Sequence, residues 1–104
     1  MVDSKRMQIN ERLTDVIRGR TIELVSKEEG MVTILFDDHS RLEIKTTGGP
    51  GANFLGEGRI EMVEEDGDSL TLFGEEDRAA TLRLAIPGSS VIVKAQNGEV
   101  EYSG

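Results

Sequence analysis

The sequence predicts a mainly β fold, namely a small antiparallel barrel or sandwich of about seven to eight short strands with one N-terminal amphipathic helix. Short runs in which apolar and polar residues alternate recur from residue 20 to residue 104, and this alternation is typical of half-buried strands. Turn-forming pairs such as Asp66-Gly67 and Asn97-Gly98 separate the runs and favour hairpins. No second helical pattern follows that would cover a parallel sheet. We therefore expect one small β domain over residues 1–104.

The N-terminal segment has the spacing of a short amphipathic helix. One apolar stripe at helical spacing is formed by Ile9, Leu13, Val16 and Ile17. This stripe predicts a helix over residues 8–18 that ends before Gly19. Asn10 is the candidate N-cap for a shorter helix, and Ser4 is the candidate for a longer one. Residues 1–6 are expected to form a flexible tail.

The expected strands cover residues 20–26, 31–36, 41–46, 59–65, 69–73, 79–86, 91–95 and 99–102. In the strand over residues 20–26, simple alternation places Ile22 and Leu24 on one face of the sheet. In the strand over residues 59–65, it places Ile60 and Met62 on one face. The run from Met31 to Phe36 is apolar at all positions except Thr33. Such a run indicates a central strand that is covered on both faces.

The acidic composition restricts the kinds of partner that we expect. The chain contains 20 Asp and Glu residues against 12 Lys and Arg residues, and its net charge of −8 repels phosphate backbones and anionic membranes. Nucleic-acid and membrane partners are therefore not expected. Arg12, Arg18 and Arg20 near the N-terminus are instead expected to pair with acidic strands of the same chain or with an acidic partner.

The absence of cysteine excludes disulfides, thiolate metal sites and cysteine nucleophiles. The sequence also shows neither an apolar signal segment nor the roughly 20 apolar residues of a membrane-spanning helix. We expect a cytoplasmic location and no cofactor.

The glycine-rich loop over residues 48–58 is the first candidate site. It lacks the Gly-Lys-Ser/Thr step of a phosphate-binding loop and precedes a strand rather than a helix, which disfavours nucleotide binding. Phe54 and Leu55 are its bulky apolar residues, and they either anchor the loop in the core or form a partner-binding tip. Together with Asn53 they are the predicted ligand-binding or partner-binding residues.

No other group of residues predicts catalysis or metal binding. The acidic turns at residues 64–68 and 75–77 lack the ligand spacing of a calcium-binding loop, so no metal site is expected. His39 is the only histidine and precedes Ser40 in a turn, where adjacent side chains rarely face one another. We interpret His39 as a turn residue and Tyr102 as a core or rim residue of the last hairpin, and we predict no catalytic residue.

These observations favour a non-enzymatic binding or accessory module that acts through protein–protein contacts and self-associates, for example as a homodimer. One alternative is a small-ligand-binding β-barrel, or a minor enzyme, with a site under the glycine-rich loop. A second alternative is an acidic inhibitor or immunity-type protein that masks a basic partner, as the net charge of −8 suggests.

Overall fold

The structure, a computed structural model, describes residues 8–47, 58–77 and 79–104. The elements in these ranges are β1 (Gln8–Ile9), α1 (Glu11–Ile17), β2 (Thr21–Glu28), β3 (Met31–Phe36), β4 (Arg41–Lys45), β5 (Gly58–Asp66), β6 (Ser69–Gly74), the 3-10 helix η1 (Glu75–Asp77), β7 (Ala79–Arg83), β8 (Val91–Lys94) and β9 (Val100–Ser103). Every strand expected from the sequence is present, and β1 is added to them.

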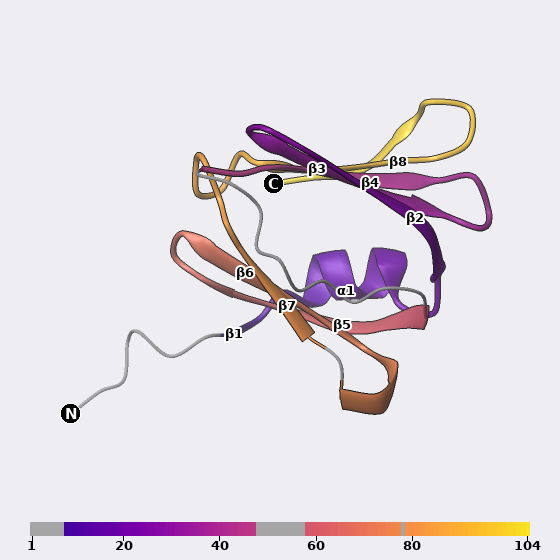
Figure 1. Cartoon of the computed structure of the whole chain (residues 1–104), viewed down its shortest axis with the longest axis horizontal. Coiled ribbons are helices and arrows are strands. Elements are labelled where there is room, and N and C mark those ends of the chain that lie inside the picture. The colour runs from indigo at the N-terminus through magenta and orange to yellow at the C-terminus, as the bar shows by residue number, and fades with distance from the viewer. Residues whose placement is uncertain (1–7, 48–57, 78) are drawn as a thin grey trace.

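Eight of the described strands form one antiparallel sheet in the order β7-β6-β5-β2-β3-β4-β8-β9, and β1 pairs with β5. The expected fold class is therefore confirmed, and the sheet is not closed into a barrel. The sheet folds over, so that β2, β3, β4 and β8 lie in one layer and β5, β6 and β7 in the other (Figure 1). A single bridge between Thr46 and Leu84 joins the chain just after β4 to the chain just after β7.

The sheet bends from one layer into the other where β2 pairs with β5. Only two residue pairs join these strands, Thr21 with Arg59 and Ile22 with Gly58. Directly beyond them, the register shifts by a β-bulge in both strands, in β2 after Ile22 and in β5 after Ile60. A bulge bends its strand and increases the local twist. Gly58, with a φ of 135°, supplies a backbone conformation at this corner that other residues rarely adopt.

The two bulges make two sequence-based assignments wrong. Ile22 is buried, but Leu24 is 59% exposed, and Val25 packs against the core in its place. In β5, Ile60 and Val63 are buried whereas Met62 is only half-buried. Each bulge adds one residue to its strand, and the side chains beyond it therefore change faces.

Strand β3 is internal to the sheet, between β2 and β4, as expected for a central strand. Val32, Ile34 and Phe36 on one face are fully buried. The other face, which carries Thr33 and Leu35, is half-buried, so the expectation that both faces are covered is wrong. The layers of the folded sheet meet on one face of β3 only, which leaves the opposite face open to solvent in part.

Helix α1 begins at Glu11, three residues later than the predicted start at residue 8. The reason is that Gln8 and Ile9 pair with Glu65 and Glu64 of β5 and form β1 instead. Asn10 is the N-cap, and its Oδ1 atom accepts a hydrogen bond from the Leu13 amide at 3.0 Å. Asparagine at this position supplies an acceptor for an amide that has no partner within the helix.

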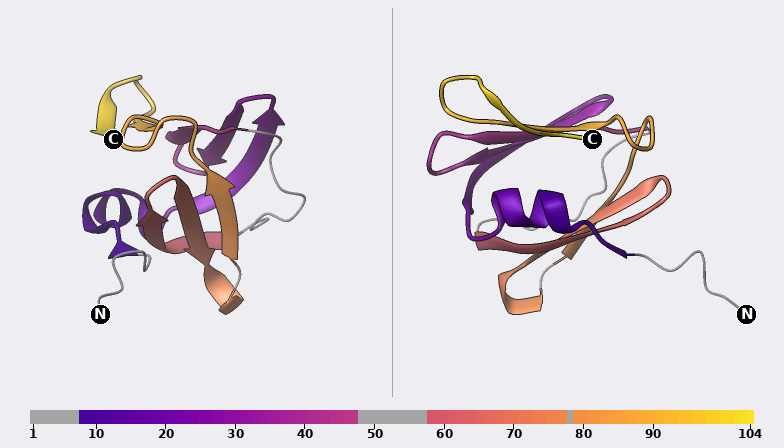
Figure 2. Two further views of the ribbon diagram at one scale, coloured as in Figure 1. Left: turned by 90° about the vertical axis from the view of Figure 1, so that its left-hand side faces the viewer. Right: turned by 180° about the vertical axis from the view of Figure 1, so that it is seen from behind.

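Helix α1 lies beside the space between the two layers of the sheet (Figure 2). Leu13 and Ile17 are fully buried in the core. The Oγ1 atom of the buried Thr14 accepts a hydrogen bond from the Val63 amide at 3.0 Å, which fixes the helix to β5. None of the helices in the described part of the chain has the length and apolar character needed to cross a membrane.

Candidate functional site

The predicted site residues Asn53, Phe54 and Leu55 lie outside the described residues. The structure therefore does not test them, and their role as a ligand-binding or partner-binding tip stays a prediction. Ser4, the candidate N-cap of a longer helix, and residues 1–6, the expected tail, also lie outside the described residues. The described polar residues that bear on a site fall in two places: the turn between β3 and β4, and the surface between α1 and β5.

The turn between β3 and β4 holds Asp38, His39 and Ser40. His39 has a left-handed backbone with a φ of 72°, and its side chain is exposed. The Oδ1 atom of Asp38 accepts hydrogen bonds from the Ser40 amide, at 2.9 Å, and from the Ser40 hydroxyl. Within the described residues no hydrogen bond joins His39 to Ser40, so these two side chains do not form a base and nucleophile pair.

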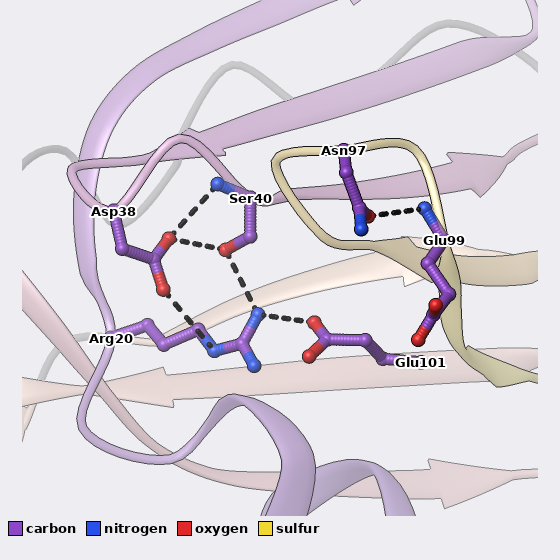
Figure 3. Close-up of polar contacts among 6 residues, drawn as sticks. All are labelled: Arg20, Asp38, Ser40, Asn97, Glu99 and Glu101. Atoms are coloured by element: carbon purple, nitrogen blue, oxygen red, sulfur yellow. Dashed lines mark hydrogen bonds and ion pairs between the residues drawn. The ribbon is translucent and has the colours of Figure 1, made fainter.

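Arg20 connects this turn to β9 (Figure 3). Its Nη1 atom donates to Ser40 Oγ at 2.8 Å and to Glu101 Oε1 at 2.9 Å, and its Nε atom lies 3.8 Å from Asp38 Oδ2. The guanidinium also lies over the ring of Phe36, 6.0 Å from the ring centroid. Arg20 therefore pairs with acidic groups of its own chain, as expected. We call Arg20, Asp38, Ser40 and Glu101 the Arg20 clamp.

The Arg20 clamp is a structural arrangement. The Ser40 hydroxyl donates its proton to Asp38 and accepts from Arg20, and Ser40 is buried, so the hydroxyl is engaged within the fold. Burial raises the pKa of Asp38, but the hydrogen bonds from the Ser40 hydroxyl and amide and the charge of Arg20 lower it by more. The net result is an Asp38 pKa below its ordinary value of 3.8.

We expect the Asp38→Asn variant to lose a pH-dependent part of the stability. Because the folded-state pKa of Asp38 is lowered, its contribution is fully present above about pH 4 and is lost as the pH falls through the folded-state pKa. The variant should be less stable than the wild type by about 1 kcal/mol at pH 6, because it loses the ion pair with Arg20 and weakens the hydrogen bonds with Ser40. The loss is no larger because solvent screens the partly exposed clamp.

The measurement is urea unfolding of both proteins between pH 6 and pH 3, and the difference should shrink toward the acidic end. Asp37→Asn is the matched control, because Asp37 is exposed in the same turn and takes no part in the clamp. If the difference in the free energy of unfolding between the wild type and Asp38→Asn stays constant from pH 6 to pH 3, the ionised Asp38 does not stabilise the Arg20 clamp.

A surface groove runs between α1 and β5. One open hollow of about 340 Å³ is lined by Arg18, Gly19, Arg59, Ile60 and Glu61. A second hollow of about 220 Å³ shares Arg18 and Glu61 with the first and continues to Ile9, Glu11, Thr14, Asp15 and Met62. We call the two together the α1–β5 groove.

The N-terminal end of the groove is held in place by Asn10 and Tyr102. The Nδ2 atom of Asn10 donates to the Tyr102 hydroxyl at 3.0 Å and to the Glu65 carboxylate. Arg12 lies over the Tyr102 ring, 5.7 Å from its centroid. Tyr102 is half-buried and packs against the core, which confirms its interpretation as a rim residue. These contacts join α1, β5 and β9.

Within the described residues, no group of three or more His, Asp or Glu side chains lies close enough together to hold a metal ion. Comparison with protein-family models, with curated proteins and with solved structures found no significant match to this chain. The edges of the sheet and the α1–β5 groove are the surfaces of the described residues that bear on function.

Proposed function

We propose that this chain is a non-enzymatic binding module that acts through protein–protein contacts and self-associates. The observation that carries the proposal is the open sheet, which ends at β7 and β9. An edge strand presents backbone N–H and C=O groups that pair readily with a strand of another chain.

Strand β9 is the edge that we assign to self-association. Val91 and Gly104 exchange two backbone hydrogen bonds of 2.9 Å each. In an antiparallel ladder the next residue points its backbone groups the other way. Ser103, which is paired with Ile92, therefore directs its N–H and C=O away from β8. Val100 on the same strand is 53% exposed, which adds an apolar side chain to this edge.

The other edge, β7, is less suited to the same role. At its C-terminal end, Arg83 O accepts a hydrogen bond from the Thr47 amide at 3.1 Å, and the Ala85 amide donates to Lys45 O at 3.0 Å. Part of this edge is thus already occupied by the chain that follows β4. The short length of β9, at four residues, limits uncontrolled strand addition and suits a contact of defined size.

Sedimentation equilibrium from low to high micromolar concentration tests the proposal. At physiological salt, where surface charges are screened beyond about 8 Å, we expect a monomer–dimer equilibrium. Ser103→Pro removes an outward N–H without removing a bond to β8, and it should weaken the dimer by about tenfold because one hydrogen bond is lost per copy. Ser103→Ala keeps the N–H and should dimerise like the wild type.

Thermal unfolding checks that both variants are folded before they are compared. A wild-type protein that stays monomeric at every concentration would overturn self-association. Equal dimer affinities for folded Ser103→Pro and Ser103→Ala would overturn the assignment to β9.

A further inference from the structure

We infer that the α1–β5 groove binds a segment of a partner protein that places an apolar side chain between basic side chains. This inference rests on the proposed function as a protein-binding module, but it concerns a surface other than β9. It is carried by the apolar residues inside the groove and by the unpaired carboxylates around it.

The interior of the groove offers apolar contact. Ile9 is 52% exposed although it is large and apolar, and the half-buried Met62 lines the same hollow. Thr14 does not require a polar ligand there, because its hydroxyl is already bonded to the backbone of Val63. Methionine adapts its flexible side chain to differently shaped partners. An apolar side chain seated here would cover surface that is now in water.

The rim of the groove is acidic. Glu11 and Asp15 on α1 and Glu61 on β5 line it, and within the described residues none of these three carboxylates forms an ion pair. Among the described residues, the basic groups of the groove are Arg18, which lines both hollows, and Arg59, which lines the first and pairs with Glu75. The three carboxylates outnumber these two guanidinium groups, so the rim carries a net negative charge. A basic segment is attracted to such a rim, and an acidic segment is repelled.

Of the two rim carboxylates on α1, Glu11 lies in the first turn, where it is favourable to the helix dipole, but Asp15 does not stabilise the helix. Glu11 and Asp15 are four residues apart and lie on the same face of α1, where two like charges destabilise a helix. Asp15 is also in the C-terminal half of α1, where a negative charge opposes the helix dipole, and the last turn carries no basic residue. A partner lysine or arginine placed between them would remove the repulsion.

The openness and charge of the groove argue against two other occupants. The hollows of about 340 and 220 Å³ are open to solvent, whereas ligand pockets of about 300–1,000 Å³ enclose most of the surface of a small ligand. They suit a few side chains of a protein segment. A second copy of this chain, with its net charge of −8, would bring a rim of the same sign against this one.

The test uses three synthetic peptides and NMR shift mapping on the full chain at low protein concentration. The first peptide alternates leucine with lysine, the second replaces lysine with glutamate, and the third replaces leucine with serine. The lysine–leucine peptide should bind and shift the amides of Ile9, Asp15 and Met62, and the other two should bind at least about tenfold more weakly. Raising the salt concentration should weaken the binding.

Two pairs of variants locate the site. Ile9→Ser and Glu61→Lys should each weaken binding of the lysine–leucine peptide by about fivefold to tenfold. Leu24→Ser and Glu23→Lys are the matched controls, because they make the same changes on the exposed part of β2; they should change the affinity by less than about twofold.

The outcomes separate this inference from the proposed function. The groove assignment would be overturned if the groove variants bound the lysine–leucine peptide as tightly as the controls do. It would also be overturned if the glutamate peptide bound as tightly as the lysine–leucine peptide, or if the amide shifts were confined to β9. Each of these outcomes would leave self-association intact. Loss of the dimer in Ile9→Ser, with peptide binding unchanged, would show that a second copy occupies the groove and would also overturn the inference. Normal peptide binding by Ser103→Pro supports two separate surfaces.

Discussion

Replacing Phe36 with alanine should lower the free energy of unfolding by about 3–5 kcal/mol. Phe36 ends β3, is fully buried, and is the largest fully buried side chain among the described residues. It pairs with Ile22 at the corner of the sheet and lies under the guanidinium of Arg20. The substitution leaves a cavity where the two layers meet, in a core that is otherwise aliphatic and cannot fill it.

Urea unfolding with linear extrapolation measures this loss. It is a large fraction of the total, because domains of this size are stable by about 5–15 kcal/mol. Leu35→Ala is the matched control, since Leu35 is the preceding residue on the half-buried face and should cost about 1–2 kcal/mol. Equal losses for the two variants would contradict the assignment of Phe36 to the centre of the core.

The second large effect is expected for Leu13→Ala, with a loss of about 2–5 kcal/mol. Leu13 is fully buried where α1 packs against the sheet, and alanine is itself a strong helix former. The loss therefore measures the packing of α1 rather than its tendency to be helical. Asp15→Ala, on the exposed side of the same helix, should change the stability by no more than about 0.5 kcal/mol.

Chemical denaturation followed by circular dichroism gives both values. A loss in Leu13→Ala as small as that in Asp15→Ala would mean that α1 is not held by its buried face. The same pair also bears on the α1–β5 groove, because an α1 that is not docked on β5 forms no groove.

Local sequence signals account for most of the fold. The Asn97-Gly98 turn forms as expected: Gly98 has a φ of 90°, and Asn97 Oδ1 accepts a hydrogen bond from the Glu99 amide at 2.9 Å. Strands and hairpins of this kind depend on residues close together in the chain. They are therefore readable from the order of apolar, polar and turn-forming residues.

The bulges and the start of α1 depend instead on residues far apart in the sequence. The corner is set by the pairing of Thr21 with Arg59, and the helix starts late because Ile9 pairs with Glu64. Alternation within a single strand carries no information about either contact. Gly58, the first residue of β5, is a local signal of an unusual backbone at this corner.

The site residues were harder to predict for the same reason. Asp38 and Ser40 form a local turn contact that the sequence suggests, but Arg20 and Glu101 come together only through the fold. The groove combines Ile9 with Met62, and the sequence placed Ile9 in the buried helix stripe and Met62 on a buried strand face. An apolar residue left exposed by a bulge or by a short added strand has no sequence signature of its own.

The most direct test of self-association through β9 is amide hydrogen exchange, measured residue by residue at low and at high protein concentration. The Gly104 amide, which donates to Val91 O within the sheet, should be protected at both concentrations. The Ser103 amide should exchange rapidly in the dilute sample and slowly in the concentrated one, because it then donates to a second copy. Rapid exchange of Ser103 at every concentration, with Gly104 protected throughout, would contradict the proposal.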